Sequence, residues 1–241
     1  MFRRIMSATA IAASLHVPGA GLAAQAADRP VVAILDFTNS ALVDHERYEP
    51  FSAGIAGMLL ADLRQNPRIE LVERERIRDL LDEIELSESG RVDPEAAVEA
   101  GRILGAHHVI VGGFVIDPQG NLRLDARAVS VETSRIEHVE TVEDDVENLL
   151  RAVTRLGRQL SASLDLPMDD SELGDPRPAR PGQVLANLKY ARALLEEDRE
   201  NAARALELYR QFLAETPPDY ALVLRREARQ RIRVLMADQG G

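Results

Sequence analysis

Hydrophobic and polar positions repeat with two different periods along the chain, and the changes of period mark the predicted elements. Residues 31–35 are all apolar and predict a strand that is buried on both faces. The apolar positions of 51–63 repeat instead at helical spacing, as do those of 74–86. A short apolar stretch at 69–72 predicts a second strand between these helices. Strands that alternate with helices are typical of a parallel sheet.

The following segments predict one more helix and then a series of antiparallel strands. Asp93 is a capping residue followed by proline and an acid, which favours a helix start, and Gly105 favours its end. Three strand patterns come next, with short polar turns between them: 107–116, 122–131 and 136–142. A long amphipathic helix is predicted at 144–164. The order β-α-β-α-α-β-β-β-α predicts an α/β domain of three-layer type with a mixed sheet.

The last quarter of the chain predicts a second, smaller domain. Residues 165–181 contain four prolines and five acidic residues, a composition typical of a linker. Residues 182–238 are helical in pattern and predict three helices, at about 182–197, 200–215 and 219–236. We therefore expect an α/β domain at 30–164, a linker at 165–181 and a small all-α domain at 182–238.

The first 26 residues have the composition of a secretion signal. Arg3 and Arg4 precede a short apolar stretch, and Ala24-Gln25-Ala26 fits the small-x-small pattern cleaved by signal peptidase. Polar residues interrupt the apolar stretch, so it falls short of the roughly 20 apolar residues that a membrane span needs. We expect a signal peptide at 1–26, cleaved near Ala26, and an exported, periplasmic protein.

Composition narrows the possible partners. The chain has no cysteine, so it has neither a disulfide nor the lipid-modified cysteine of a lipoprotein, and we expect no direct lipid anchor. The net charge is −11, and loss of the two signal arginines makes it −13. Such an acidic balance disfavours nucleic acid and anionic lipid surfaces as partners of the chain as a whole.

Few residues offer catalytic or metal chemistry. His107 and His108 are adjacent, so in a strand they face opposite sides and cannot chelate one metal. The acidic residues of the linker lack the spacing of a calcium loop. Lys189 is the only lysine, and the sequence has neither a phosphate-binding glycine loop nor a G-x-S-x-G nucleophile motif. We expect no enzymatic activity, no cofactor and no bound metal.

Six short pieces of the α/β segment resemble, in their order, the curli-secretion-channel (CsgG-type) family and the related N-terminal domain of TolB-like proteins. The pieces are Val31–Asn39 ending in Asp-Phe-x-Asn, Gly54-x-x-Gly57-Met58-Leu59, Leu71-Val72-Glu73-Arg74, Leu80-Leu81-x-Glu83, Gly101-x-x-Leu104-Gly105-Ala106 and His108–Gly112. The resemblance spans about 30–164 and implies a non-enzymatic accessory or scaffold in the assembly or secretion of surface structures. Its partners would be envelope proteins or further copies of the chain.

Two features of this chain depart from that family, whose channel is a lipoprotein that inserts amphipathic hairpins to build a transmembrane barrel. The first is that the chain has no cysteine to carry a lipid, and the second concerns the hairpins. Here the turns at 117–121 and 132–135 are short, and the strands beside them carry charges without an aromatic girdle. We therefore favour a periplasmic accessory protein, associated with the outer membrane through partners, and keep an outer-membrane pore component as an alternative.

Seven residues are candidates for contacts with a partner: Asp36, Phe37, Asn39, Glu73, Arg74, Tyr209 and Phe212. Asp36 and Asn39 follow a strand and are suited to bind the amides of the next loop. Glu73 and Arg74 are suited to an ion pair at a domain or subunit edge. The two helical glycines at 54 and 57 predict a helix that approaches the sheet closely.

The helical tail allows two interpretations. Residues 205–217 resemble the second helix of a tetratricopeptide repeat, in which small and aromatic residues pack against a neighbouring helix and proline ends the unit. The tail is therefore either a protein-docking adapter or a helical hairpin that caps the α/β domain. The sequence leaves both open.

Overall fold

The structure is a computed structural model and describes residues 29–83, 94–168 and 182–238. The predicted signal peptide, the predicted helix start at Asp93 and most of the predicted linker lie outside the described residues.

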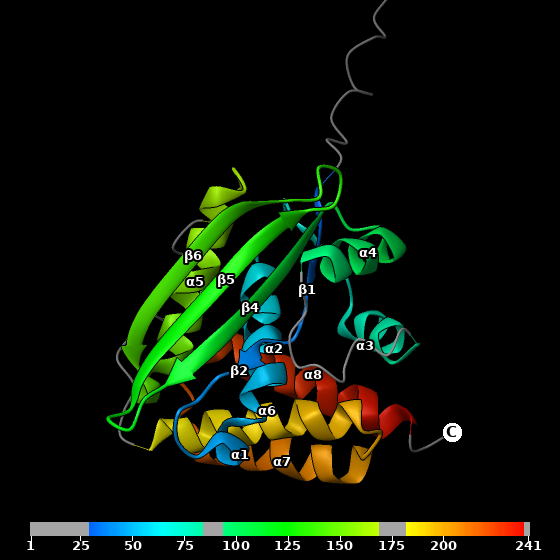
Figure 1. The fold of residues 1–241 in the computed structure, drawn as a ribbon. Coiled ribbons are helices and arrows are strands. Elements are labelled where there is room, and N and C mark those ends of the chain that lie inside the picture. The colour runs from blue at the N-terminus through cyan, green and yellow to red at the C-terminus, as the bar shows by residue number, and fades with distance from the viewer. Residues whose placement is uncertain (1–28, 84–93, 169–181, 239–241) are drawn as a thin grey trace, which may run out of the picture.

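A six-stranded mixed sheet forms the centre of the fold (Figure 1). Its main path has the order β3 (Glu70–Leu71), β1 (Val31–Ile34), β4 (His108–Ile116), β5 (Asn121–Ser130) and β6 (Arg135–Asp145). β1 is parallel to both of its neighbours, whereas β5 is antiparallel to both β4 and β6. The predicted α/β class with a mixed sheet is confirmed.

The segment after β1 is more ordered than its polar composition predicts. β2 (Thr38–Asn39) pairs in parallel with the second half of β4, and a short helix, α1 (His45–Tyr48), follows. The ring of Tyr48 stacks on Phe51 at a centroid distance of 5.8 Å. One aromatic side chain is thus enough to fix this polar segment onto the core.

Helices cover the sheet from both sides. α2 (Phe51–Leu63) and α5 (Leu149–Ser163) pack on one face, where the inward side chains of β4 and β5 belong to the same hydrophobic cluster. α3 (Arg74–Glu83) and α4 (Pro94–Leu104) cover β1 and the first half of β4 on the other face, over a separate cluster. Figure 1 shows the resulting three layers. These layers agree with the predicted architecture.

Two predicted helix boundaries illustrate what local pattern can and cannot locate. Gly105 follows α4 with φ of +70°, a conformation that favours glycine, so the predicted helix end is confirmed. The predicted helix at 144–164 begins later, because β6 extends to Asp145. The Asp145 carboxylate accepts a hydrogen bond from Glu147 N–H at 2.8 Å and starts the short 3-10 helix η2 (Val146–Asn148), which leads into α5.

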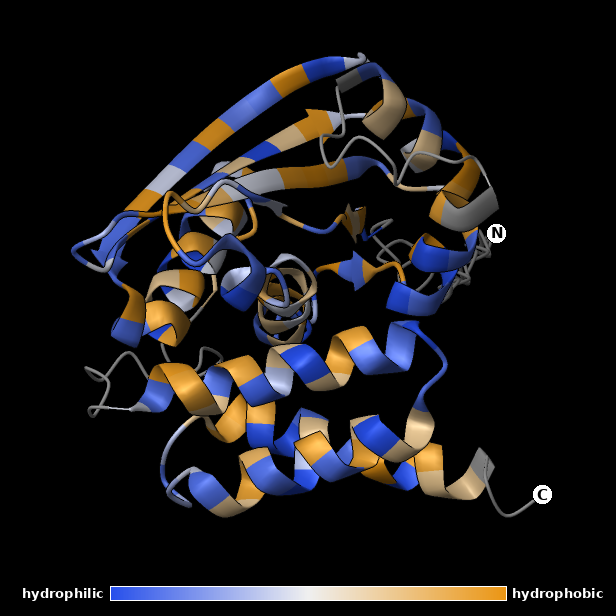
Figure 2. Cartoon of the chain, turned by 60° about the horizontal axis from the view of Figure 1, so that its bottom comes forward, coloured by the Kyte–Doolittle hydropathy of each residue, from blue (hydrophilic) through white to orange (hydrophobic). Residues whose placement is uncertain are grey.

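The C-terminal helices form a further layer that packs against α2. They are α6 (Gln183–Asp198), α7 (Ala202–Glu215) and α8 (Leu222–Asp238), called here the α6–α8 layer. Figure 2 shows α2 nearly end-on between the sheet and this layer. One hydrophobic cluster runs from the sheet through α2 into α6, α7 and α8. The α6–α8 layer therefore shares its core with the α/β part of the chain.

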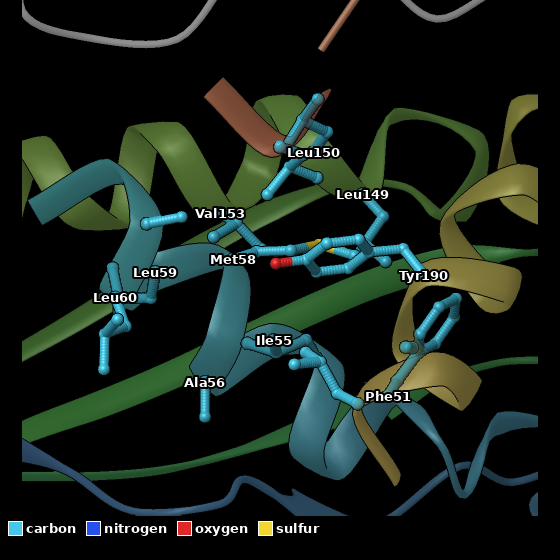
Figure 3. Close-up of a cluster of buried hydrophobic side chains, with 14 of the residues drawn as sticks. Phe51, Ile55, Ala56, Met58, Leu59, Leu60, Leu149, Leu150, Val153 and Tyr190 are labelled. Atoms are coloured by element: carbon cyan, nitrogen blue, oxygen red, sulfur yellow. The ribbon is translucent and has the colours of Figure 1, made fainter. Parts of the chain in front are cut away.

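Helix α2 is buried on every side, and nearly all of its residues are closed to solvent. Ile55 and Met58 converge with Val153 of α5 and Tyr190 of α6 in the core (Figure 3). A helix that is apolar all round belongs inside a protein rather than on its surface. This explains why α2 packs against the sheet, α5 and the α6–α8 layer together.

Gly54 and Gly57 bring α2 close to α6, and the prediction that they serve packing against the sheet is wrong. A Cβ placed on Gly54 would lie 2.4 Å from Ala191 Cβ, and one on Gly57 would lie 2.4 Å from Leu194 Cδ1. Real Cβ atoms do not approach other atoms so closely. The two glycines therefore set the distance between α2 and α6.

We predict that Gly54→Ala destabilises the fold more than Gly57→Ala does. Both changes gain about 1 kcal/mol of helix propensity. The Gly54 site meets the Cβ and backbone of Ala191, which cannot move without shifting α6, whereas the Gly57 site meets the end of a flexible leucine. Urea unfolding should show a loss of about 1–3 kcal/mol for Gly54→Ala and little change for Gly57→Ala.

Adding Ala191→Gly to Gly54→Ala provides the control, because it removes the Cβ that the new methyl group meets. Recovery of most of the lost stability is expected. No recovery would mean that the contact between these two helices does not cause the loss.

Candidate functional site

A crevice opens where the carboxyl end of β1 and the start of α3 face the α6–α8 layer; we call it the junction crevice. Its floor is apolar and includes Gly57 and the Tyr190 ring, and its walls carry three arginines and several carboxylates. The lining residues are Ile34, Ala56, Gly57, Leu60, Arg64, Glu73, Arg74, Glu75, Tyr190, Leu194, Glu227 and Arg231.

Arg74 joins three elements at this crevice. From the first turn of α3 its Nη1 donates to Asp36 Oδ1, just after β1, at 2.8 Å. Its Nη2 donates to Asp198 Oδ2, at the end of α6, at 2.5 Å. The Arg74 side chain is 15% exposed and Asp198 is 19% exposed, so little water screens this contact. One guanidinium thus ties the sheet and α3 to the α6–α8 layer.

Two further arginines repeat this arrangement. Arg231 of α8 donates to Glu75 of α3 at 2.5 Å and to Glu197 of α6. Arg64, just after α2, donates to both oxygens of Glu227 on α8, at 3.1 and 3.2 Å, and to Glu73 at 3.1 Å. Each of the three guanidiniums therefore contacts two carboxylates, and every contact set includes the α6–α8 layer.

The electrostatics of the crevice hold these groups in their charged forms. Burial disfavours the charged Arg74 guanidinium, but Asp36 and then Asp198 outweigh it and raise the pKa of Arg74. Burial also works against Glu75, yet hydrogen bonds from its own backbone N–H and from Arg231 lower the pKa of Glu75 overall. The Tyr209 hydroxyl donates to Glu197 at 2.6 Å, and burial raises the pKa of Tyr209.

The arrangement is suited to holding elements together. Its three guanidiniums are matched by six carboxylates, so neither an unpaired cation nor a poised nucleophile is present among the crevice residues described above. Among the residues that the structure describes, no group of three or more acids and histidines is placed to hold a metal ion. Within the same residues, no helix has the length and apolarity to cross a membrane.

Three of the seven predicted contact residues meet at the junction crevice. Asp36 binds the guanidinium of Arg74, and not the loop amides expected of it. Glu73 and Arg74 do not pair with each other, because Glu73 pairs with Arg64. Asn39 lies away from the crevice: its Oδ1 accepts from Ala41 N–H at 3.0 Å, as predicted for a residue that fixes the next loop.

The three aromatic candidates are core residues, and the structure corrects their interpretation as contact residues. Phe37 is 1% exposed, and Tyr209 and Phe212 are fully buried. The rings of Tyr209 and Phe212 lie 5.8 and 5.3 Å from that of Tyr190. Tyr209 and Phe212 are buried because the face of α7 that carries them packs on α6, so neither ring is open to a partner.

Several crevice residues were not predicted from the sequence. Arg64, Arg231 and Asp198 lie far along the chain from the residues they bind, and their local pattern is that of ordinary solvated helix positions. The i, i+4 spacing of Glu227 and Arg231 suggests a pair on one helix face. The structure instead directs each toward a different element.

A second polar group is buried beyond the crevice. Asp62 of α2 is 1% exposed and accepts a hydrogen bond from Thr154 Oγ1 of α5 at 2.7 Å. Its other oxygen, Oδ1, is buried without a hydrogen-bond partner among the described residues. Burial raises the pKa of Asp62 to about 6, although the Thr154 hydrogen bond and the charge of Arg158 lower it.

The family resemblance noted above is confirmed for the N-terminal part of the chain. Residues 18–116 match the family model described as "Curli production assembly/transport component CsgG". The described part of this match runs through β1 to β4, and it includes Asp36, Glu73 and Arg74 of the junction crevice. No curated protein sequence matches the chain significantly.

Several solved structures share part of the fold. The LpoB C-terminal domain from Salmonella enterica is 16% identical over 48% of this chain and 83% of its own length, with a TM-score of 0.37. TolB from Acinetobacter baumannii is 14% identical over 59% of this chain and 30% of its own, with a TM-score of 0.40. The PelC dodecamer from Paraburkholderia phytofirmans is 10% identical over 58% and 89%, with a TM-score of 0.37. These likenesses concern the fold alone.

We predict that Arg74→Met costs about 3 kcal/mol of stability, because it leaves Asp36 and Asp198 facing each other without a cation. Arg123→Met is the matched control: Arg123 pairs with Asp125 on the sheet surface and is 52% exposed, so its loss should change stability little. Urea unfolding of both variants measures the difference. Equal small effects would contradict a structural role for the junction crevice.

The raised pKa of Asp62 predicts how the stability of the fold depends on pH. A carboxyl that is protonated more readily in the folded chain stabilises it most at low pH, and this contribution falls as pH rises from 4 through 6. Asp62→Asn does not titrate, so the stability of the variant relative to wild type should improve by roughly 3 kcal/mol between pH 4 and pH 7.5.

Asp144→Asn is the control of opposite sign. Burial works against the charged Asp144 carboxylate, but the hydrogen bond from Arg151 and others outweigh it and lower the pKa of Asp144. Its stabilising effect is therefore lost only as the pH falls below about 5, so Asp144→Asn should become worse relative to wild type as pH rises toward about 5 and should then stay level up to pH 7.5. A flat difference for Asp62→Asn across this range would contradict the assignment.

Proposed function

We propose that this chain is a non-enzymatic, periplasmic accessory protein of the cell envelope that acts in the assembly or transport of surface structures through contacts with other proteins. The observation that carries the proposal is the match of residues 18–116 to a curli production assembly/transport component. The secretion signal predicted at 1–26 and the absence of cysteine support an exported protein without a lipid anchor of its own.

The chemistry of the junction crevice supports a scaffold rather than a catalyst. Its arginines are saturated by carboxylates, and the same contacts fix the α6–α8 layer to α2 and α3. A side chain that is fully engaged in structural ion pairs is not poised for proton transfer or nucleophilic attack. A rigid body with fixed surfaces is what a protein that positions partners requires.

The free edge of β6 is the surface we assign to partner contacts. β6 is eleven residues long and ends the sheet, so one row of its backbone N–H and C=O groups has no strand beside it in the described chain. Val139 is 60% exposed on this strand. The strand carries four acids that are open or partly open to solvent, Glu137, Glu140, Glu143 and Asp145, whereas Asp144 is 5% exposed and pairs with Arg151 and Arg155. Like charges disfavour pairing with a second β6, so the edge favours a basic strand or surface.

The alternative of a tetratricopeptide-like adapter has less support. The aromatic residues that carry the resemblance are buried, and α6 and α8 pack against α2 of the same chain. Deletion of 183–241 would not test the adapter cleanly. It would expose the surface of α2 around Gly54 and Gly57 to water and so disturb the rest of the fold. Single surface substitutions in the intact chain test the proposal better.

We predict that a cysteine at position 139 reports the partner contact. The chain has no cysteine, so Val139→Cys on β6 and Ile103→Cys on α4 each introduce one reactive thiol, at sites 60% and 53% exposed. In the periplasm of cells that make the protein, a thiol crosslinker should join the Val139→Cys chain to one partner of defined mass and should leave Ile103→Cys unlinked.

Two further measurements complete this experiment: cell fractionation locates the protein, and light scattering gives the mass of the purified Val139→Cys chain. We expect the protein in the periplasmic fraction, and purified Val139→Cys should not form a β6–β6 disulfide dimer at neutral pH because of the acidic edge. A chain found in the cytoplasm, or a Val139→Cys chain that crosslinks no more than Ile103→Cys, would overturn the proposed function.

A further inference from the structure

The exposed face of α8 differs in charge from the rest of the molecule. Its outward residues are Leu222, Arg226, Arg229, Gln230, Arg233, Val234, Met236 and Ala237. They include three arginines and no acid, in a chain whose net charge is −11. Arg226, Arg229 and Arg233 follow a spacing of i, i+3 and i+7, so their guanidiniums line up along one side of the helix over about 10 Å.

These arginines are not neutralised by neighbours. Arg226 donates to the amide oxygen Gln65 Oε1 at 3.0 Å, and none of the three forms an ion pair with a carboxylate of the described residues. Arg210 of α7 adds a fourth guanidinium beside this face, where it donates to Met236 Sδ at 3.7 Å. By contrast, the arginines of the junction crevice are each held by two carboxylates. Other exposed arginines without an ion pair lie singly on other elements, whereas this face of α8 gathers three of them.

Exposed apolar side chains accompany the cations. Leu222 is 52% exposed, Val234 44% and Met236 53%, and the helical spacing places Leu222 between the arginines and the other two at their flanks. An acidic protein surface would satisfy the arginines alone. A lipid bilayer satisfies both kinds of side chain, because anionic phosphates lie directly above an apolar interior.

We propose that the exposed face of α8 binds an anionic phospholipid surface. The guanidiniums donate hydrogen bonds to lipid phosphates, while Leu222, Val234 and Met236 enter the boundary between head groups and acyl chains. The acidic balance of the whole chain, which disfavours such surfaces, acts at longer range and makes the attachment salt-sensitive and reversible. The proposal does not rest on the function proposed above. It gives a chain without cysteine a direct means of peripheral attachment.

The test is flotation of the full chain without residues 1–26 on vesicles of phosphatidylglycerol mixed with phosphatidylethanolamine, with pure phosphatidylcholine vesicles as the neutral comparison. We expect binding to the anionic vesicles at low salt, loss of binding at high salt and none to phosphatidylcholine. The triple variant Arg226→Gln, Arg229→Gln, Arg233→Gln should bind on the order of a hundredfold more weakly.

A matched triple variant separates the face from the total charge. Arg76, Arg135 and Arg192 are exposed on α3, β6 and α6, and they form no ion pair with a carboxylate of the described residues. Changing these three to glutamine alters the net charge equally and should weaken binding only a few-fold. If it weakens binding as much as the α8 variant, or if the unaltered chain does not float with anionic vesicles, the proposal fails.

A second pair of measurements distinguishes a membrane from an acidic protein. Leu222→Ser with Val234→Ser keeps every charge and should weaken vesicle binding several-fold, because the apolar contact is lost. Soluble polyglutamate should compete poorly with vesicles. If polyglutamate binds as well as the vesicles do and the serine variant binds like the unaltered chain, then the face recognises an acidic protein and the lipid assignment is wrong.

Discussion

The close approach of α2 and α6 is the contact on which the rest of the structure depends. Gly54 and Gly57 let Ala191 and Leu194 of α6 reach the backbone of α2. With the sheet and α5 on its other sides, α2 becomes the shared core of the whole molecule. Because packing in protein interiors is dense, a methyl group added at Gly54 meets the Cβ and backbone of Ala191 and must move α6. The α6–α8 layer is therefore built into the fold.

The ion pairs of the junction crevice follow from this contact. Once α6 lies against α2, its last turn brings Asp198 to the end of β1, where Arg74 lies between Asp198 and Asp36. Burial of apolar surface supplies most of the stability of such a junction. The ion pairs add little net energy but penalise wrong arrangements, since a shifted α6 would leave a carboxylate or a guanidinium without its partner. The glycines set the distance between the helices, and the arginines set their register.

Local pattern predicted the elements well and the long-range contacts poorly. The strands, the helix ends at Gly105 and the mixed sheet follow from periodicity and from turn residues, which act over a few positions. The α6 partners of Gly54 and Arg74 are Ala191 and Asp198, which lie more than a hundred residues away, and no local signal specifies them. The same limit explains Tyr209 and Phe212: aromatic residues at helical spacing fit a core and a docking surface equally well until the neighbouring helix is known.

The two surfaces assigned to partners belong to different layers of the molecule and carry opposite charge. The acidic β6 edge bounds the sheet at one side, and α8 with its exposed arginines belongs to the layer beneath it (Figure 1). An anionic membrane attracts the exposed α8 arginines and repels the acids of β6. Its electrostatic field therefore favours orientations of the chain in which β6 faces away from the membrane. Attachment through α8 would then leave the free strand edge of β6 facing away from the membrane. Because the shared core makes the molecule rigid between these surfaces, the membrane contact fixes the direction in which a partner approaches.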